Sequence, residues 1–336
     1  MRATRLLVLG AALVLAGCPN AGEDQLLRVG GTGVVQGGVA FDWNGSRAIE
    51  QAQDSPMAGV RVRLVTTSGL DSVAVAVSTP GGFFQMSGVP VGTYRVVIDS
   101  APLGDTAVVA RLDSTTVTVL PGDTVSFSVI VSYPHYTILQ ARAATVPLGR
   151  RVFIEGIALN LLSTFRDTTL HVQDNSAAIR ATRVRATPFN PGDSVRLRGT
   201  MSVRTGQRTI DDVTMLVLAP AFVPSAAGLS TLLAAGAAGG TRDAQIVQVL
   251  NALITDTLRV PGGGGWQITV NDTTGPLQVL LDATADPAFT TAQLPPLPAS
   301  PYIPNNRFDI VGVLVPTGAA GTWRLKPRNA SDLVQQ

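Results

Sequence analysis

Short segments with a two-residue hydrophobic period are the feature that most constrains the fold of this chain. In Val60 to Leu64, three apolar residues share one face, and Arg61 and Arg63 share the other. This is the pattern of a half-buried antiparallel strand. Similar segments recur along the 336 residues, and turns rich in glycine and proline separate them. The sequence therefore predicts an all-β protein, and a typical size of ~150 residues per domain predicts two or three domains.

The N-terminus has the order of features found in an export signal. Arg2 and Arg5 precede an apolar run of about ten residues, from Leu6 to Leu15, and small residues follow it. A membrane-spanning helix needs about 20 apolar residues, so this run is too short to remain in a bilayer as a span. We therefore predict a signal peptide over residues 1–17 and a tether over residues 18–33.

The signal ends in Leu15-Ala16-Gly17-Cys18, which contains the only cysteine of the chain. This ending resembles the lipobox of bacterial lipoproteins, and the resemblance implies cleavage before Cys18 and acylation of its thiol and new N-terminus. Several acyl chains, at ~0.8 kcal/mol per buried CH₂, would anchor the protein permanently in a lipid bilayer. By the sorting rule of that family, proline rather than aspartate at position 19 indicates the outer membrane. The alternative is an ordinary cleaved signal with a chance cysteine.

Two motifs within residues 34–133 characterise the first predicted domain. Pro56 to Val62 reads Pro-x-Ala-Gly-Val-x-Val, and Gly82 to Val96 reads Gly-x-Phe-x-Met-x-x-Val-Pro-x-Gly-x-Tyr-x-Val. Together they resemble the carboxypeptidase-regulatory-like, prealbumin-like β-sandwich, to which collagen-adhesin B-type repeats and starch-binding-like domains are similar. The resemblance implies a stalk, a spacer or an accessory carbohydrate-binding module. The domain contains no lysine, so the internal Lys–Asn isopeptide bond of some members is not expected.

Residues 137–220 contain five strand patterns and resemble the OB-fold barrel of extracellular bacterial proteins. The matching pieces include Val-x-Ile-Glu-Gly-Ile from Val152 and Pro-Gly-Asp-Ser-Val-x-Leu-x-Gly-Thr from Pro191. Residues 221–240 indicate either a linker or a weak helix. The five-strand order recurs over residues 241–334, where a turn at Asp272 repeats the turn at Asp174. The predicted fold is a prealbumin-like β-sandwich followed by two five-stranded OB-like barrels.

Positive charge is concentrated in the first predicted barrel. Residues 135–220 carry 11 arginines against six acidic residues, although the net charge of the chain is only +2. OB folds bind ligands on strands two and three and in the first and last hairpin loops. The arginines expected there are candidates to bind an anionic polymer, either a nucleic acid or an acidic glycan: Arg166, Arg180, Arg204 and Arg208. The alternative is that outward-facing arginines only keep an exported barrel soluble.

The sequence contains no motif for catalysis or for metal binding. Its two histidines, His135 and His171, and one cysteine are too few for a soft-metal site. Gly-Asp-Ser at 192–194 and Gly-Asp-Thr at 122–124 each precede a strand pattern, which favours a turn over a hydrolase nucleophile. We therefore predict no cofactor and no enzymatic activity.

The sequence thus predicts a non-enzymatic lipoprotein of the cell envelope with a structural or display role. Its expected partners are the lipid bilayer, through acylated Cys18, and neighbouring envelope proteins. The alternative function is a binding module that holds a polysaccharide or a nucleic acid on the basic first barrel.

The lipid anchor gives the first testable prediction. Metabolic labelling with a palmitate analogue should mark the wild-type protein and leave Cys18→Ser unlabelled, because the serine hydroxyl cannot replace the thiol that the anchor requires. On cell fractionation, the wild type should follow the membranes and the variant should be released. Immunoblots of both proteins control for expression, and equal labelling of the two would refute the anchor.

Overall fold

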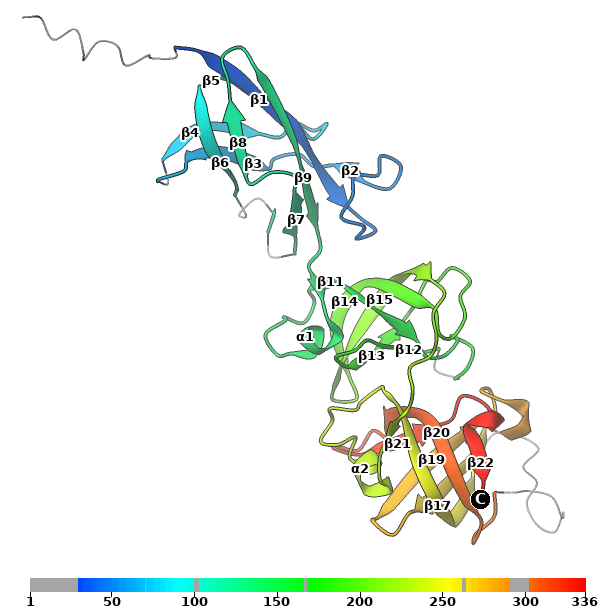
Figure 1. Ribbon diagram of the computed structural model, residues 1–336. Helices are drawn as coiled ribbons and strands as arrows, with labels where there is room; N and C mark the ends of the chain where they lie inside the picture. Colours follow the sequence, from blue (N-terminus) through cyan, green and yellow to red (C-terminus); the bar gives the residue numbers. More distant parts are fainter. Residues whose placement is uncertain are drawn as a thin grey trace, which may run out of the picture.

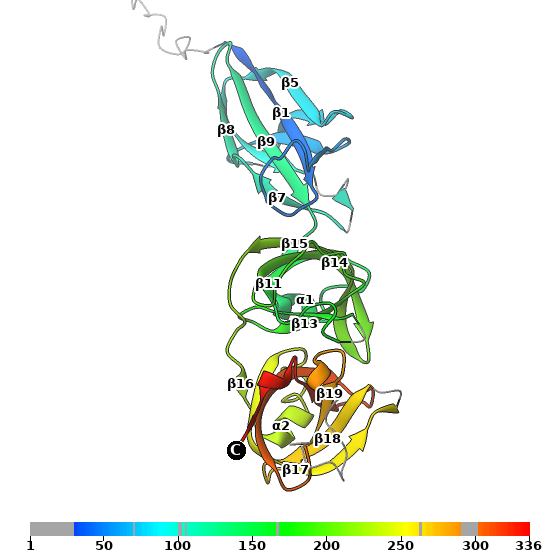
Figure 2. The same ribbon diagram turned by 90° about the vertical axis from the view of Figure 1, so that its right-hand side faces the viewer.

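Three β units follow one another in a row in the computed structural model of this protein (Figure 1). The structure describes residues 30–69, 71–99, 103–104, 106–165, 168–261, 264–289 and 302–336. The predicted signal peptide, Cys18 and most of the predicted tether lie outside these residues. A second view shows the same succession of units (Figure 2). The predicted all-β class, a sandwich followed by two barrels, is confirmed.

The first unit is a sandwich of two sheets. One sheet has the order β2 (Ser55–Pro56), β1 (Thr32–Asp42), β9 (Thr124–Ser132), β7 (Val108–Leu112), and β5 (Phe83–Pro90) also pairs with β1. The other has the order β4 (Ser72–Val77), β3 (Arg61–Thr66), β6 (Gly92–Ile98), β8 (Thr116–Val119). Val62 and Leu64 are completely buried in the core between the sheets. Arg63, on the opposite face of β3, pairs with Asp99 at 2.9 Å, so the predicted alternation is confirmed.

The second unit is a closed five-stranded barrel. Its strands follow the order β11 (Arg151–Ala158), β12 (Leu170–Gln173), β13 (Ala178–Thr182), β15 (Gln207–Ala219), β14 (Ser194–Arg204), and pairing of β14 with β11 closes the ring. β13 and β15 run parallel and the other barrel pairs are antiparallel. This is the strand order of an OB fold. A short strand, β10 (His135–Tyr136), and one helical turn, α1 (Ile138–Arg142), precede the barrel.

The third unit repeats this plan. Its ring is β17 (Ile246–Arg259), β18 (Gly265–Asn271), β19 (Pro276–Asp282), β21 (Trp323–Lys326), β20 (Arg307–Pro316), with β19 and β21 parallel and β17 paired to β20. The 3-10 turns η3 (Pro287–Phe289) and η4 (Ala330–Asp332) and the strand β22 (Leu333–Gln335) complete the unit. Among the described residues, no helix is long and apolar enough to span a membrane.

The segment predicted as a linker or a weak helix over residues 221–240 contains a helix. β16 (Ala227–Gly228) pairs with β17, and α2 (Thr231–Ala235) follows it. Ala234 and Ala237 are completely buried in the core of the third unit. From residue 227 onward this segment therefore belongs to the second barrel, and the connection between the barrels is shorter than the linker prediction.

The same aspartate turn holds the helical turn of each barrel. The Asp174 carboxylate accepts a hydrogen bond from the Ile138 backbone N–H at 2.8 Å, and Asp272 accepts one from the Thr231 backbone N–H at 3.0 Å. The first turn of a helix leaves its N–H groups without partners inside the helix, and a carboxylate that accepts from them stabilises the turn. The predicted correspondence of the two turns is therefore a repeated structural device.

Asp272 gives a prediction for the dependence of stability on pH. Burial raises the pKa of Asp272, but hydrogen bonds from Thr274 and Thr231 outweigh it and lower the pKa from 3.8 to about 2. The stability that the carboxylate contributes is therefore complete above pH 3.8 and is lost as the pH falls through about 2. Both carboxylate oxygens accept hydrogen bonds, and the amide nitrogen of asparagine cannot accept one. Asp272→Asn should therefore lower the free energy of unfolding by about 1 kcal/mol at pH 7, and this deficit should shrink in urea titrations below pH 4.

Asp256→Asn is the matched control, because Asp256 is exposed on the same barrel. It should leave the free energy of unfolding nearly unchanged at every pH. A deficit of Asp272→Asn that stays constant from pH 7 to pH 2.5 would contradict the role given to the carboxylate charge.

Candidate functional site

Two of the predicted ligand-binding arginines are bound to groups of the first barrel itself. The Arg204 guanidinium lies 3.0 Å from the Asp211 carboxylate. Arg208 donates to the backbone carbonyl of Val146 at 2.6 Å. The Arg204 side chain therefore joins the two strands of the β14–β15 hairpin, and Arg208 ties this hairpin to the segment before β11.

A third predicted residue, Arg180, points toward the second barrel. Its guanidinium donates to the Arg204 carbonyl at 3.0 Å and lies 3.9 Å from the Asp243 carboxylate, which is only 1% exposed. Burial raises the pKa of Asp243, while Arg180 and the indole N–H of Trp323 act in the opposite direction. Arg180 therefore lies at the contact between the barrels and not in an open ligand groove. The fourth predicted residue, Arg166, is outside the described residues.

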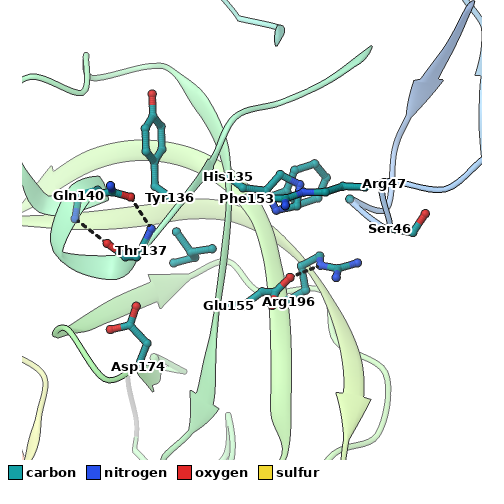
Figure 3. Close-up of a pocket in the computed structure, with 12 residues that line it drawn as sticks. Ser46, Arg47, His135, Tyr136, Thr137, Gln140, Phe153, Glu155, Asp174 and Arg196 are labelled. Carbon is teal, nitrogen blue, oxygen red and sulfur yellow. Dashed lines mark hydrogen bonds and ion pairs between the residues drawn. The ribbon is translucent and has the colours of Figure 1, made fainter. Parts of the chain in front are cut away.

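A loop of the sandwich, residues 43–46, meets the first barrel and encloses a hollow there. The hollow measures about 420 Å³ and is lined from both units (Figure 3). His135 stacks on Phe153 with ring centroids 4.7 Å apart, and Arg196 pairs with Glu155 at 2.8 Å beside it. Burial, with help from Arg47 and Arg196, lowers the pKa of His135 from 6.5 to about 4. The imidazole is therefore neutral at physiological pH.

A second hollow, of about 460 Å³, opens on the outer surface of β11, β14 and β15. Four arginines and one acidic residue line it, together with Gly199 and Thr214: Arg151, Arg183, Arg185, Arg198 and Asp212. This excess of guanidinium groups makes it the strongest candidate for an anion site among the described residues.

Strand pairing explains how distant arginines reach one surface. Arg198 faces Phe153 across the β11–β14 pair, and Arg151 lies two residues before Phe153 on the same strand. Residues at such diagonal positions share a face of the sheet. Thr214 on β15 lies opposite Arg198. Thr214 also forms an isolated β-bridge with Arg185, and this bridge brings the segment after β13 to the same surface.

A third, smaller hollow continues this surface. It measures about 240 Å³, shares Arg198 and Thr214 with the arginine hollow, and includes Trp43, Phe153 and Leu216 in its lining. Trp43 is 38% exposed, and the Arg198 guanidinium lies 5.5 Å from the centre of its ring. The two hollows form one groove with a cationic part and an apolar part.

Part of the arginine excess of residues 135–220 lines the arginine hollow, on a different face of the barrel from the one predicted. The alternation Arg183-x-Arg185 and Arg196-x-Arg198 is visible in the sequence, and period two places such pairs on one side of a strand. The OB-fold resemblance instead directed attention to strands two and three and their loops. The sequence did not indicate that Trp43 lines the groove, because Trp43 belongs to the sandwich and reaches the groove only where the sandwich contacts the first barrel.

The described residues contain no group of three or more histidine, cysteine, aspartate or glutamate side chains that could hold a metal ion. His171, the other histidine, is 1% exposed and lies beside Asn160, with its ring Nδ1 3.1 Å from the Asn160 amide oxygen. Its strand neighbours Leu170 and Val172 face the core of the first barrel, so His171 lies on the other face of β12, opposite Arg180 and toward the contact between the barrels.

No protein-family model matches the chain, and no curated protein matches it. Similar solved structures include GBS52, the minor pilin of Streptococcus agalactiae, with 15% identity and a TM-score of 0.25 over 31% of this chain and 45% of that chain. The hypothetical protein ygiW from E. coli has 17% identity and a TM-score of 0.21, over 26% of this chain and 97% of that chain. A murine DNA-binding protein bound with double-stranded DNA has 10% identity and a TM-score of 0.29, over 52% of this chain and 90% of that chain. These TM-scores are below 0.5, so the fold assignment rests on the strand orders given above.

His135 yields a prediction for the docking of the sandwich on the first barrel. Between pH 4 and 6.5 the unfolded chain binds more protons at this position than the folded protein does, because the folded pKa is about 4. The free energy of unfolding should therefore rise with pH across this window. His135→Gln should remove that part of the slope in denaturant titrations. An unchanged slope in His135→Gln would contradict the assigned burial of a neutral imidazole.

Proposed function

We propose that the chain is a non-enzymatic, lipid-anchored protein of the cell envelope whose β units form a stiff spacer. In this proposal the acyl chains on Cys18 insert into a lipid bilayer. In a cell that has an outer membrane, this bilayer is the outer membrane. The second barrel is presented to neighbouring envelope proteins. The observation that carries the proposal is the direct contact at both junctions between the units. β1 also begins at the end of the row farthest from the second barrel (Figure 1), which is where an N-terminal anchor would have to join a spacer.

The junction between the sandwich and the first barrel combines a short connection with side-chain contacts. β9 ends at Ser132 and β10 begins at His135, so only two residues separate the units. Arg198 donates to the Trp43 carbonyl at 2.6 Å, and Arg196 donates to the Asn44 carbonyl at 3.1 Å. Two guanidinium groups of the barrel therefore hold the loop of the sandwich.

The junction between the barrels buries both apolar and charged groups. Leu159 of the first barrel packs in a cluster with Ile246 and Val313 of the second, and all three are almost completely buried. Arg142 of α1 donates to the Gly240 carbonyl of the second barrel at 2.8 Å. These contacts oppose rotation of one barrel against the other.

The only lysine of the chain reinforces the same junction. Lys326 of the second barrel lies 3.3 Å from the Asp282 carboxylate, and both side chains are about 5% exposed. Its ammonium also lies 4.1 Å from the centre of the Phe165 ring of the first barrel, a cation–π arrangement that gains strength when it is desolvated. The contact couples a buried ion pair of one barrel to a loop of the other.

The hollow lined by four arginines favours a second candidate function, which is binding of an anionic polymer by the first barrel. This function and the spacer role are compatible, because the hollow lies on the outer surface of the barrel.

The spacer proposal predicts a single, narrow distance between its ends. In a Cys18→Ser background, Arg95→Cys and Asp256→Cys would carry the only thiols of the chain, one on the sandwich and one on the second barrel. Both positions are exposed. Spin labels at these two sites should give one narrow distance distribution in pulsed electron paramagnetic resonance, because a stiff spacer holds its ends at a single separation.

Arg142→Ala should broaden this distribution, because it removes the hydrogen bonds that cross the barrel junction. Arg259→Ala is the matched control on the exposed surface of the second barrel and should leave the distribution unchanged. A broad distribution in the parent protein would overturn the spacer role.

A further inference from the structure

The arginine hollow holds its guanidinium groups in place before any ligand arrives. Arg198 is fixed by the Trp43 carbonyl, Arg151 donates to the Tyr133 hydroxyl at 3.2 Å, and Arg183 lies 2.8 Å from Asp212. A guanidinium has five N–H donors, so each of these groups keeps donors for a ligand. Fixed side chains lose less conformational entropy on binding than free ones.

Arg185 differs from the other three. Its side chain is exposed and makes no hydrogen bond or ion pair with the described residues. Its backbone is held on both sides, since its N–H donates to Val213 at 2.7 Å and its carbonyl accepts from Met215 at 3.0 Å. An exposed guanidinium on a hydrogen-bonded backbone segment therefore lies beside the guanidinium groups of Arg151, Arg183 and Arg198 and the Asp212 carboxylate.

This balance of charge requires an anion of more than one negative charge or several anionic groups. Four guanidinium groups share the hollow with the single carboxylate of Asp212, and like charges held this close repel one another. The planar donor fork of arginine matches the oxygens of phosphate, sulfate and carboxylate. The hollow therefore fits oxyanion groups.

The neighbouring hollow favours a ligand longer than a free ion. It shares Arg198 and Thr214 with the arginine hollow, and its exposed apolar residues, Trp43 and Leu216, are suited to the C–H faces of a sugar. A ligand that fills both would place an anionic group among the arginines and an uncharged, partly apolar unit beside Trp43.

We propose that this groove binds an acidic polysaccharide through Arg151, Arg183, Arg185 and Arg198. A single-stranded nucleic acid fits less well, because such ligands stack successive bases on several aromatic rings. The arginine hollow has no aromatic residue in its lining, and Trp43 is the one exposed ring of the neighbouring hollow. The inference rests on the second candidate function and names its ligand class.

The test uses the purified full chain and three probes: a heparin oligosaccharide, inorganic sulfate and a single-stranded oligonucleotide. Calorimetry at two salt concentrations should show heparin binding that weakens steeply as salt rises, because binding releases counterions. Arg185→Gln should weaken heparin binding roughly tenfold, as expected for loss of one charge-assisted contact. It removes no hydrogen bond of the folded protein, so it should leave thermal unfolding unchanged.

Matched controls separate the groove from general electrostatic attraction. Arg95→Gln and Arg259→Gln make the same change of charge at exposed positions outside the groove, and each should change heparin affinity less than about twofold. Arg183→Gln, inside the groove, should weaken binding as Arg185→Gln does.

The possible outcomes distinguish failure of the proposed ligand class from failure of the second candidate function. Tighter binding of the oligonucleotide than of heparin, with the same loss in Arg185→Gln, would overturn the polysaccharide while leaving anion binding in place. Binding of sulfate but not of heparin would overturn the polymeric ligand. No binding of any probe, or equal effects of Arg185→Gln and Arg259→Gln, would overturn both the ligand class and the second candidate function.

Discussion

Buried charge at the contact between the two barrels is the constraint on which the arrangement of the molecule depends. Asp243 is 1% exposed, and a carboxylate withdrawn from water in this way must be compensated by charges or hydrogen bonds. Its partners come from both units: Trp323 donates from the second barrel at 2.7 Å, and Arg180 approaches from the first. Either barrel alone would leave part of this set unsatisfied, so the polar groups fix how the barrels meet.

The sandwich meets the first barrel through a different combination of forces. Aromatic rings of Phe41, Trp43 and Tyr133 gather at the end of the sandwich, and guanidinium groups of the barrel bind the carbonyls of the same loop. Because Arg198 takes part in this docking and also lines the arginine hollow, the groove exists only when the two units are joined. Ligand binding there would also hold the junction.

In the two barrels, local sequence patterns predicted the corresponding turns but not the helical turn of the second barrel. The turn at Asp174 and the turn at Asp272 were matched by their sequence context, and both prove to hold a helical turn that precedes its barrel. The helical turn over Thr231–Ala235 was only one of two alternatives for residues 221–240. A segment of five residues rich in alanine has little periodicity, and only its burial against the barrel core, through Ala234, decides its structure.

The strands and the order of the units could be predicted from the sequence, because the alternation of apolar and polar residues and the turns between them are local. The sequence also located the excess of arginine in residues 135–220. The contacts that each arginine makes depend on the tertiary fold. In the sequence, nothing near Arg180 indicates its partner Asp243, which is 63 positions away and lies beside it only in the folded protein. Arg151 and Arg198 come close to Arg185 through strand pairing across the barrel. Contacts between units join residues that are far apart in the sequence, so a local sequence pattern cannot predict them.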